Sequence, residues 1–196
     1  MRAPGFWPIL SMGATFGYGN YFFVAWLHTY LLRARDYSEG DLLLTALPFA
    51  CGACANLASG VMSDRLLKRF GLKAARRWLG QAGLGSGALF VLLATLTDSK
   101  SLTLMLLSLS FAGISCCQSI GFPTCIDVAR KWPGSMSGAY NMAVSLGAFV
   151  SGVAFGYIVA VSGNYDLPLI LMALVLGSGA LLWLKIDPTR QLLAQG

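Results

Sequence analysis

The polar side chains inside the apolar segments of this chain are neutral. Tyr18 and Tyr21 are three residues apart, so they share one face of a helix. Gln118 and Asn141 are amides, and an amide in hydrocarbon is costly unless it finds a hydrogen-bond partner. Each of these side chains can either bind a polar solute or join neighbouring helices, and the sequence leaves both interpretations open. As a set, they suit the wall of a cavity.

Ionisable residues lie at the ends of the apolar segments. Asp64 and Asp127 occupy such ends, and the single histidine, His28, lies near the end of the first segment. A proton-coupled or ion-coupled carrier usually needs a carboxylate or an arginine buried in the membrane. The chain lacks such a group, and this absence needs an explanation.

The cysteines do not form a convincing reactive site. All five lie inside apolar segments, and Cys51 and Cys54 form a CxxC pattern. No basic group near them in the sequence would lower a thiol pKa. We therefore interpret them as packing residues, and we predict neither a metal site nor a cofactor.

The elements that must position these residues are membrane helices. Hydrophobic residues make up 56% of the 196 residues and charged residues only 11%, whereas a soluble domain has about one quarter charged. A helix needs about 20 apolar residues to cross a bilayer. Six segments qualify: Phe6–Leu32, Leu42–Met62, Trp78–Thr97, Leu102–Ile126, Ser135–Val161 and Leu167–Leu184. We predict an all-α membrane protein in which residues 1–196 form one domain of six transmembrane helices.

Basic residues favour one side of the predicted membrane. Eleven of the 14 Lys and Arg residues, Arg2 and Arg190 among them, lie at the termini or in the connectors Asp64–Arg77 and Asp127–Gly134. Because cytoplasmic loops carry an excess of Lys and Arg, we predict that both termini are cytoplasmic. The same bias explains the net charge of +6, so we expect the lipid bilayer and no nucleic acid as a partner. We expect a multi-pass protein of the cell membrane, of a bacterial inner membrane in particular.

An enzymatic interpretation lacks the histidine that would act as its general base. The residues Gly113, Ile114 and Ser115 in a six-helix protein resemble the serine motif of the rhomboid intramembrane proteases. That chemistry requires a histidine within hydrogen-bond reach of the serine. The only histidine, His28, lies in the first segment near its end, and we predict that the chain is not an enzyme.

One connector carries a recognisable motif. The residues from Gly60 to Arg69 read GVMSDRLLKR. They resemble the G-x-x-[AS]-D-R-x-x-[RK] loop between the second and third helices of each six-helix half in transporters of the major facilitator superfamily. The resemblance implies a gating motif made of Gly60, Asp64, Arg65 and Arg69. In it, Gly60 permits tight packing and Asp64 faces a helix N-terminus of the opposing half.

Longer stretches resemble the anion:cation symporter branch of that superfamily. Tyr18–Leu32 (YGNYFFVAWLHTYLL) is similar to its seventh helix, and Pro133–Asn141 (PGSMSGAYN) to its junction of the tenth and eleventh helices. The resemblance implies transport of a small organic anion of the sugar-acid or carboxylate class, usually coupled to protons. It assigns substrate binding to four residues of this chain: Tyr18, Tyr21, Gln118 and Asn141.

The chain also departs from the family pattern. His28 and Gly152 stand where the branch commonly has proline, and the pattern of six further helices is missing. The resemblance places the principal substrate arginine and the coupling carboxylate in that N-terminal half, which would then be the partner of this chain. We therefore expect a fragment that works as the C-terminal half of a larger carrier. The alternatives are a six-helix membrane scaffold or regulatory protein without transport activity, and a homodimer that would lack a fixed positive charge.

Overall fold

The computed structural model describes residues 5–189, apart from the side chains of Glu39 and Leu42. Arg2 and Arg190, which the predicted topology counts, lie outside the described residues. The elements in chain order are α1 (Phe6–Tyr21), the π-helical segment η1 (Phe22–Trp26), α2 (Leu27–Ala34), the 3-10 segment η2 (Glu39–Ala46), α3 (Leu47–Thr95), α4 (Lys100–Val128), α5 (Pro133–Ser162) and α6 (Asp166–Leu182). Within residues 5–189 all regular structure is helical, as predicted.

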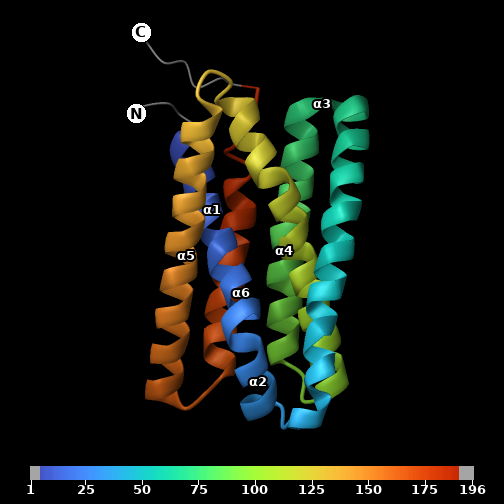
Figure 1. Cartoon of the computed structure of the whole chain (residues 1–196), viewed down its shortest axis with the longest axis vertical. Coiled ribbons are helices and arrows are strands. Elements are labelled where there is room, and N and C mark those ends of the chain that lie inside the picture. Colours follow the sequence, from blue (N-terminus) through green and yellow to red (C-terminus); the bar gives the residue numbers. More distant parts are fainter. Residues whose placement is uncertain (1–4, 190–196) are drawn as a thin grey trace.

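The longest element, α3, consists of two helices. Gly71 has a φ of 81° and a ψ of 170°, a backbone conformation that glycine adopts easily and other residues rarely. The segments 47–70 and 72–95 therefore run side by side in opposite directions (Figure 1). The prediction of a 14-residue polar connector Asp64–Arg77 is wrong in its extent, because these residues are helical on both sides of Gly71. Leu, Lys, Arg and Ala favour helix, so both helices continue beyond the apolar segment.

The first apolar segment is interrupted. Sequence analysis predicts one helix over Phe6–Leu32, but the π-helical turn Phe22–Trp26 separates α1 from α2. A π-helical turn inserts an extra residue into the helical ladder and is frequent at functional sites. Trp26, at its end, has a φ of −115°, outside the ordinary helical range.

The apolar helices are those of a multi-pass membrane protein. Three helical stretches in the described part of the chain are long and apolar enough to cross a bilayer: Leu43–Thr95, Lys100–Val128 and Pro133–Ser162. The helix α6 is apolar but only 17 residues long. Since α3 also folds back at Gly71, the structure agrees with several crossings, and the number six stays a prediction.

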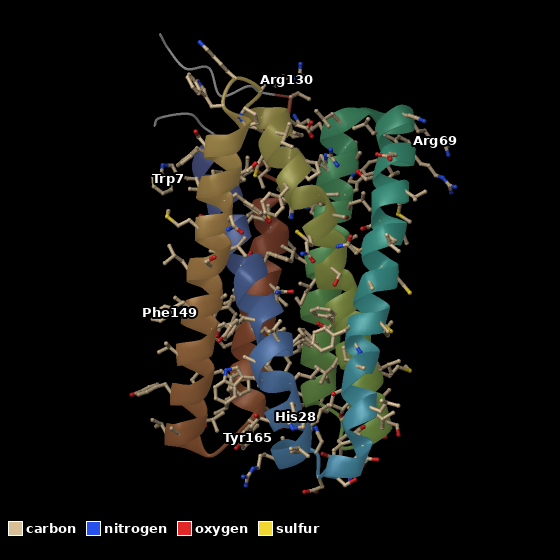
Figure 2. All side chains as sticks on the ribbon, viewed as in Figure 1. Trp7, His28, Arg69, Arg130, Phe149 and Tyr165 are labelled. Atoms are coloured by element: carbon tan, nitrogen blue, oxygen red, sulfur yellow. The ribbon has the colours of Figure 1, made fainter. Side chains whose placement is uncertain are left out.

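The helices pack as one bundle. Both halves of α3 pack on α4, α1 packs on α5 and α6, and α6 also packs on α3 (Figure 1). The turn at Gly71 lies at the same end of the bundle as the first turn of α1 in Figure 1. Figure 2 places Arg69 and Arg130 at this end, and His28 and Tyr165 at the opposite end. The predicted separation of basic residues therefore corresponds to the two ends of the bundle.

Candidate functional site

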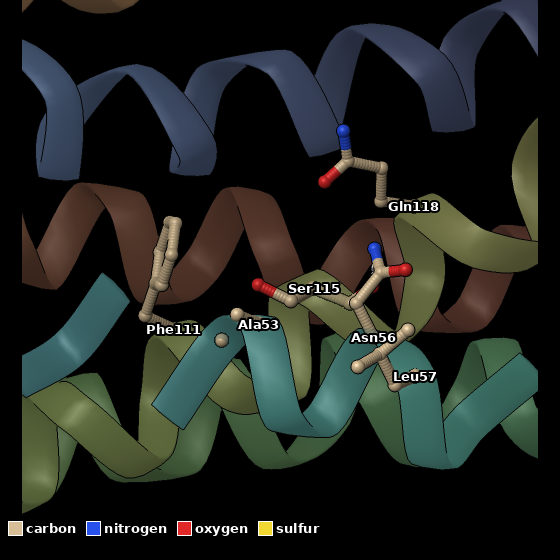
Figure 3. Close-up of a pocket in the computed structure, with 7 residues that line it drawn as sticks. Ala53, Asn56, Leu57, Phe111, Ser115 and Gln118 are labelled. Carbon is tan, nitrogen blue, oxygen red and sulfur yellow. Dashed lines mark hydrogen bonds between the residues drawn. The ribbon is translucent and has the colours of Figure 1, made fainter. Parts of the chain in front are cut away.

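An open pocket lies between the first half of α3 and α4, near the middle of both helices (Figure 3). Its volume is about 380 Å³, and its lining residues are Gly52, Ala53, Asn56, Leu57, Phe111, Ser115 and Gln118. The Asn56 Nδ2 donates a hydrogen bond to the backbone carbonyl of Ser115, at 3.3 Å. Gln118 is exposed, and Figure 3 shows its amide extending away from α4 toward the ribbon of α1. The pocket thus has a neutral polar wall.

A second pocket lies between α5 and the segment that runs from the end of α1 through η1 into α2. Its volume is about 490 Å³, and its lining residues are Tyr21, Ala25, Trp26, Thr29, Phe149, Gly152 and Val153. The Trp26 ring stacks on the Phe155 ring with 4.7 Å between centroids. A Cβ at Gly152 would lie 2.8 Å from Tyr21 Cε1, so the glycine makes room for the tyrosine ring. The π-helical turn sets the positions of Ala25 and Trp26, and so it shapes this aromatic pocket.

The structure does not gather the four predicted substrate residues into one pocket. Gln118 lines the first pocket and Tyr21 lines the second. Tyr18 is buried, with 7% of its surface exposed. Asn141 is exposed on α5, and its backbone carbonyl accepts a hydrogen bond from the Ser145 hydroxyl at 3.0 Å. Within residues 5–189 no hydrogen bond involves the side chain of Gln118 or Asn141, so neither joins two of these helices.

The predicted gating motif lies at the end of the bundle where α3 turns. Asp64, Arg65 and Arg69 are exposed, and no ion pair within the described residues involves them. A Cβ at Gly60 would meet nothing within 4 Å, so the tight packing expected of this glycine is not made among residues 5–189. The motif therefore presents its polar groups outward.

A different arginine ties the helices together at this end. Arg76 Nη2 lies 3.1 Å from Asp127 Oδ2, and Arg76 Nη1 donates a hydrogen bond to the Ser63 hydroxyl at 2.9 Å. These contacts join both halves of α3 to α4. The Arg76 side chain is largely shielded, with 12% of its surface exposed, so its ionic contact is less screened by water than that of an exposed pair.

The segment after α6 is fixed to the same end. Lys73 Nζ lies 2.7 Å from Asp187 Oδ2, and the Thr189 hydroxyl donates a hydrogen bond to the same carboxylate. The bond from Lys73, followed by that from Thr189, lowers the pKa of Asp187 from 3.8 to about 2. Arg77 Nε donates a hydrogen bond to the Ile186 carbonyl at 2.9 Å.

A second ionic cluster lies at the opposite end. Arg35 Nη2 lies 3.1 Å from Asp166 Oδ1, which also accepts a hydrogen bond from the Tyr30 hydroxyl at 2.8 Å. Arg35 donates another hydrogen bond to the Ala94 carbonyl at 3.2 Å. Sequence reasoning missed this cluster, because Arg35 and Asp166 are far apart along the chain.

Sequence reasoning also missed Asn56 as a site residue. It is an amide inside the apolar segment Leu42–Met62, which is the signal that singled out Gln118 and Asn141. The same cost of burying an amide would have identified it.

Comparison with known proteins agrees with the helical architecture. The family model described as Major Facilitator Superfamily matches residues 1–152. The chain is 34% identical over 184 residues to a probable sulfoacetate transporter of Cupriavidus necator, covering 93% of this chain and 43% of the relative. It is 29% identical over 150 residues to a probable galactarate/D-glucarate transporter of Bacillus subtilis, covering 75% of this chain and 32% of the relative.

This chain also covers less than half of a further relative. The chain is 26% identical over 186 residues to a probable L-galactonate transporter of Escherichia coli, covering 91% of this chain and 40% of the relative. The chain thus spans about two fifths of the length of such relatives.

Proposed function

Because this chain belongs to the major facilitator superfamily, we propose that it forms a six-helix half of a secondary transporter for a small organic anion. Relatives that it resembles are named as transporters of sulfoacetate and of galactarate or glucarate, which are small organic anions. The proposed substrate is an anion of the sugar-acid or carboxylate class, moved by alternating access with a second six-helix unit and coupled to protons.

The observation that carries the proposal is the unpaired amides of Gln118 and Asn141. Both are exposed on apolar helices, and neither side chain has a hydrogen bond within residues 5–189. An unpaired amide facing lipid is costly. Two such groups are explained if both meet water and substrate in a central cavity that a second half closes.

The proposed binding wall combines the two pockets. Gln118 and Asn141 supply hydrogen-bond donors and acceptors, and Tyr21 supplies a hydroxyl and an aromatic face. We keep Tyr18 in this wall as a proposal because it lies one helical turn before Tyr21, although its ring is buried in this structure. The charged groups that bind the anion and carry the proton belong to the partner half.

Reconstitution in liposomes tests the proposal. The chain alone should insert into the membrane, since each helix satisfies its own backbone hydrogen bonds. It should take up no sulfoacetate or galactarate, with or without a pH gradient, whereas the complete carrier that contains it should show saturable uptake. Uptake by the chain alone would favour the homodimer, and a complete carrier that moves neither anion would overturn the proposed function.

We also propose that Asp64 belongs to a gate at the cytoplasmic end. Its carboxylate is exposed and has no ion pair among the described residues, so it is free to face a helix N-terminus of the other half. Such a contact is worth about 0.3–2 kcal/mol. The Asp64→Asn variant of the complete carrier should express normally and transport more slowly, and unchanged transport would reduce Asp64 to a loop-orienting role.

We also propose an orientation of the bundle in the membrane. The end with the Gly71 turn should face the cytoplasm, because it gathers most of the basic residues. A cysteine at Lys73 should resist an impermeant maleimide added to intact cells, and a cysteine at Asn164 should react. The reverse labelling pattern would invert the topology.

A scaffold or regulatory function is the second candidate. It is favoured by one observation: the lining of both pockets contains no charged side chain that would bind an anion. Under this interpretation the complete assembly would move no anion, so the same liposome experiment decides between the two.

A further inference from the structure

The pocket between α3 and α4 contains three polar side chains at the same level of the bundle. Asn56 comes from α3, while Ser115 and Gln118 come from α4, one helical turn apart (Figure 3). All three are neutral, and the remaining lining is apolar, with the Phe111 ring as one wall. A volume of about 380 Å³ falls in the range of pockets that bind small molecules.

These side chains retain unused hydrogen-bonding groups. The bond from Asn56 Nδ2 to the Ser115 backbone carbonyl uses one of two amide hydrogens, and within residues 5–189 the side-chain oxygen Asn56 Oδ1 accepts no hydrogen bond. Within residues 5–189 no hydrogen bond involves the Ser115 hydroxyl or the Gln118 amide. The pocket therefore offers donors and acceptors together.

This combination matches a hydroxyl group better than a carboxylate. A hydroxyl both donates and accepts, as an amide does, whereas an ionised carboxylate only accepts. A carboxylate placed here would also have no counter-charge, because no lining residue is charged. The Phe111 ring suits the carbon–hydrogen face of a polyhydroxylated chain.

We propose that Asn56, Ser115 and Gln118 bind the hydroxyl groups of a polyhydroxylated acid and so determine specificity for hydroxylated over plain organic anions. The inference rests on the proposed transport function, and it adds Asn56 and Ser115 to the binding wall. The charged end of the substrate then binds outside this chain, and the uncharged middle binds here.

Two six-carbon dicarboxylates that differ only in their hydroxyl groups test the inference. The complete carrier in liposomes is assayed for uptake of galactarate and of adipate, with sulfoacetate as a small anion that has no hydroxyl group. A site built to bind substrate hydroxyls rejects an analogue without them. Galactarate should therefore be preferred over adipate by at least about tenfold in kcat/KM.

The Asn56→Leu variant should raise the KM for galactarate about tenfold, the effect of one or two lost hydrogen bonds, and should raise the KM for sulfoacetate by a much smaller factor. The Gln118→Leu variant should likewise raise the KM for galactarate by a larger factor than the KM for sulfoacetate. Since Gln118 has no hydrogen bond within the described residues, its replacement decides the question if Asn56→Leu fails to fold. The control is Asn164→Leu, the same substitution in the connector between α5 and α6, which should change neither uptake.

The outcomes separate this inference from the proposed function. A carrier that moves none of the three anions would overturn the transport proposal itself. Two results would overturn only the hydroxyl site. In the first, the carrier takes up sulfoacetate and takes up galactarate and adipate equally well. In the second, both variants lose sulfoacetate and galactarate uptake in parallel.

Discussion

The α1–α5 pair and the α3–α4 pair are held together in different ways. At the α1–α5 crossing, a Cβ at Gly17 would overlap the Val144 carbonyl oxygen, and a Cβ at Gly147 would overlap the Ala14 carbonyl oxygen. This interface depends on shape, because small residues let the two backbones approach closely. Neither glycine at the crossing can be replaced by a larger residue without a clash with the backbone of the other helix.

The α3–α4 pair also has a close backbone contact, where a Cβ at Gly83 would lie 2.8 Å from the Gly113 carbonyl oxygen, but it adds side-chain hydrogen bonds between the helices. The Ser110 hydroxyl donates to the Gly87 carbonyl at 2.8 Å, and the Ser59 and Ser119 hydroxyls share a hydrogen bond. Polar groups between these helices leave some donors and acceptors unused, as the Asn56 pocket shows. The α1–α5 pair therefore has a closely packed interface, whereas the α3–α4 pair has a groove with unused polar groups.

The largest effect should come from filling the α1–α5 crossing. The Gly17→Ala substitution forces the methyl group against the backbone of Val144, which cannot move as a flexible side chain would. We expect a loss of about 3 kcal/mol or a failure to fold, measured as thermal unfolding of the detergent-solubilised chain.

The matched control is Gly177→Ala in α6, where a Cβ would meet nothing within 4 Å. That substitution should be neutral or should stabilise the helix by up to about 1 kcal/mol. Equal effects of the two substitutions would show that close backbone approach does not hold α1 to α5.

A smaller effect is expected at α3–α4. Ser110→Ala removes the hydrogen bond to the Gly87 carbonyl and should cost about 1 kcal/mol. Ser178→Ala is the control, since among the described residues the Ser178 hydroxyl donates only to the Val175 carbonyl of its own helix. If both serine variants unfold at the same temperature, hydrogen bonds between helices contribute little, and the contrast between the two pairs disappears.

The smallest effect concerns the ion pair of Lys73 and Asp187. Because folding lowers the pKa of Asp187 from 3.8 to about 2, the pair stabilises the fold fully at pH values above about 4. This stabilisation is lost as the pH falls toward 2, when the carboxylate becomes protonated in both states. The Lys73 side chain is 48% exposed, so the effect should be at most about 1 kcal/mol.

Thermal unfolding between pH 5 and pH 2, compared between the wild-type chain and Lys73→Met, measures this contribution. The difference between the two proteins should shrink as the pH falls. A difference that stays constant with pH would show that Lys73 acts through packing and not through the carboxylate.

Much of the fold could be predicted from the apolar segments, because segment length and composition determine membrane helices. Two features could not. The polar composition of Asp64–Arg77 is typical of a loop, but its residues have high helix propensity and most of them are helical. The position of the turn at Gly71 within this segment could therefore not be predicted. The π-helical turn Phe22–Trp26 depends on how α1 packs, and no residue type within it predicts it.

The types of residue in the candidate site could be predicted from the sequence, but the places of their side chains in the fold could not. The cost of an unpaired amide identified Gln118, which lines a pocket, and would have identified Asn56. Tyr18 is buried although Tyr21, three residues later, lines a pocket. The rotation of α1 about its axis decides this difference, and that rotation follows from packing on α5 and α6.

The cluster of Arg35, Tyr30 and Asp166 has a consequence for biosynthesis. Asp166 follows Arg35 by 131 residues, so the ribosome delivers the arginine long before its partner. An arginine that is buried in the finished bundle stays uncompensated until α6 inserts. The helices before α6 should therefore be recognised by membrane quality control until α6 has been synthesised. A nascent chain that stops before Asp166 should be degraded faster than one that ends after α6, and equal half-lives would show that the cluster has no such checkpoint role.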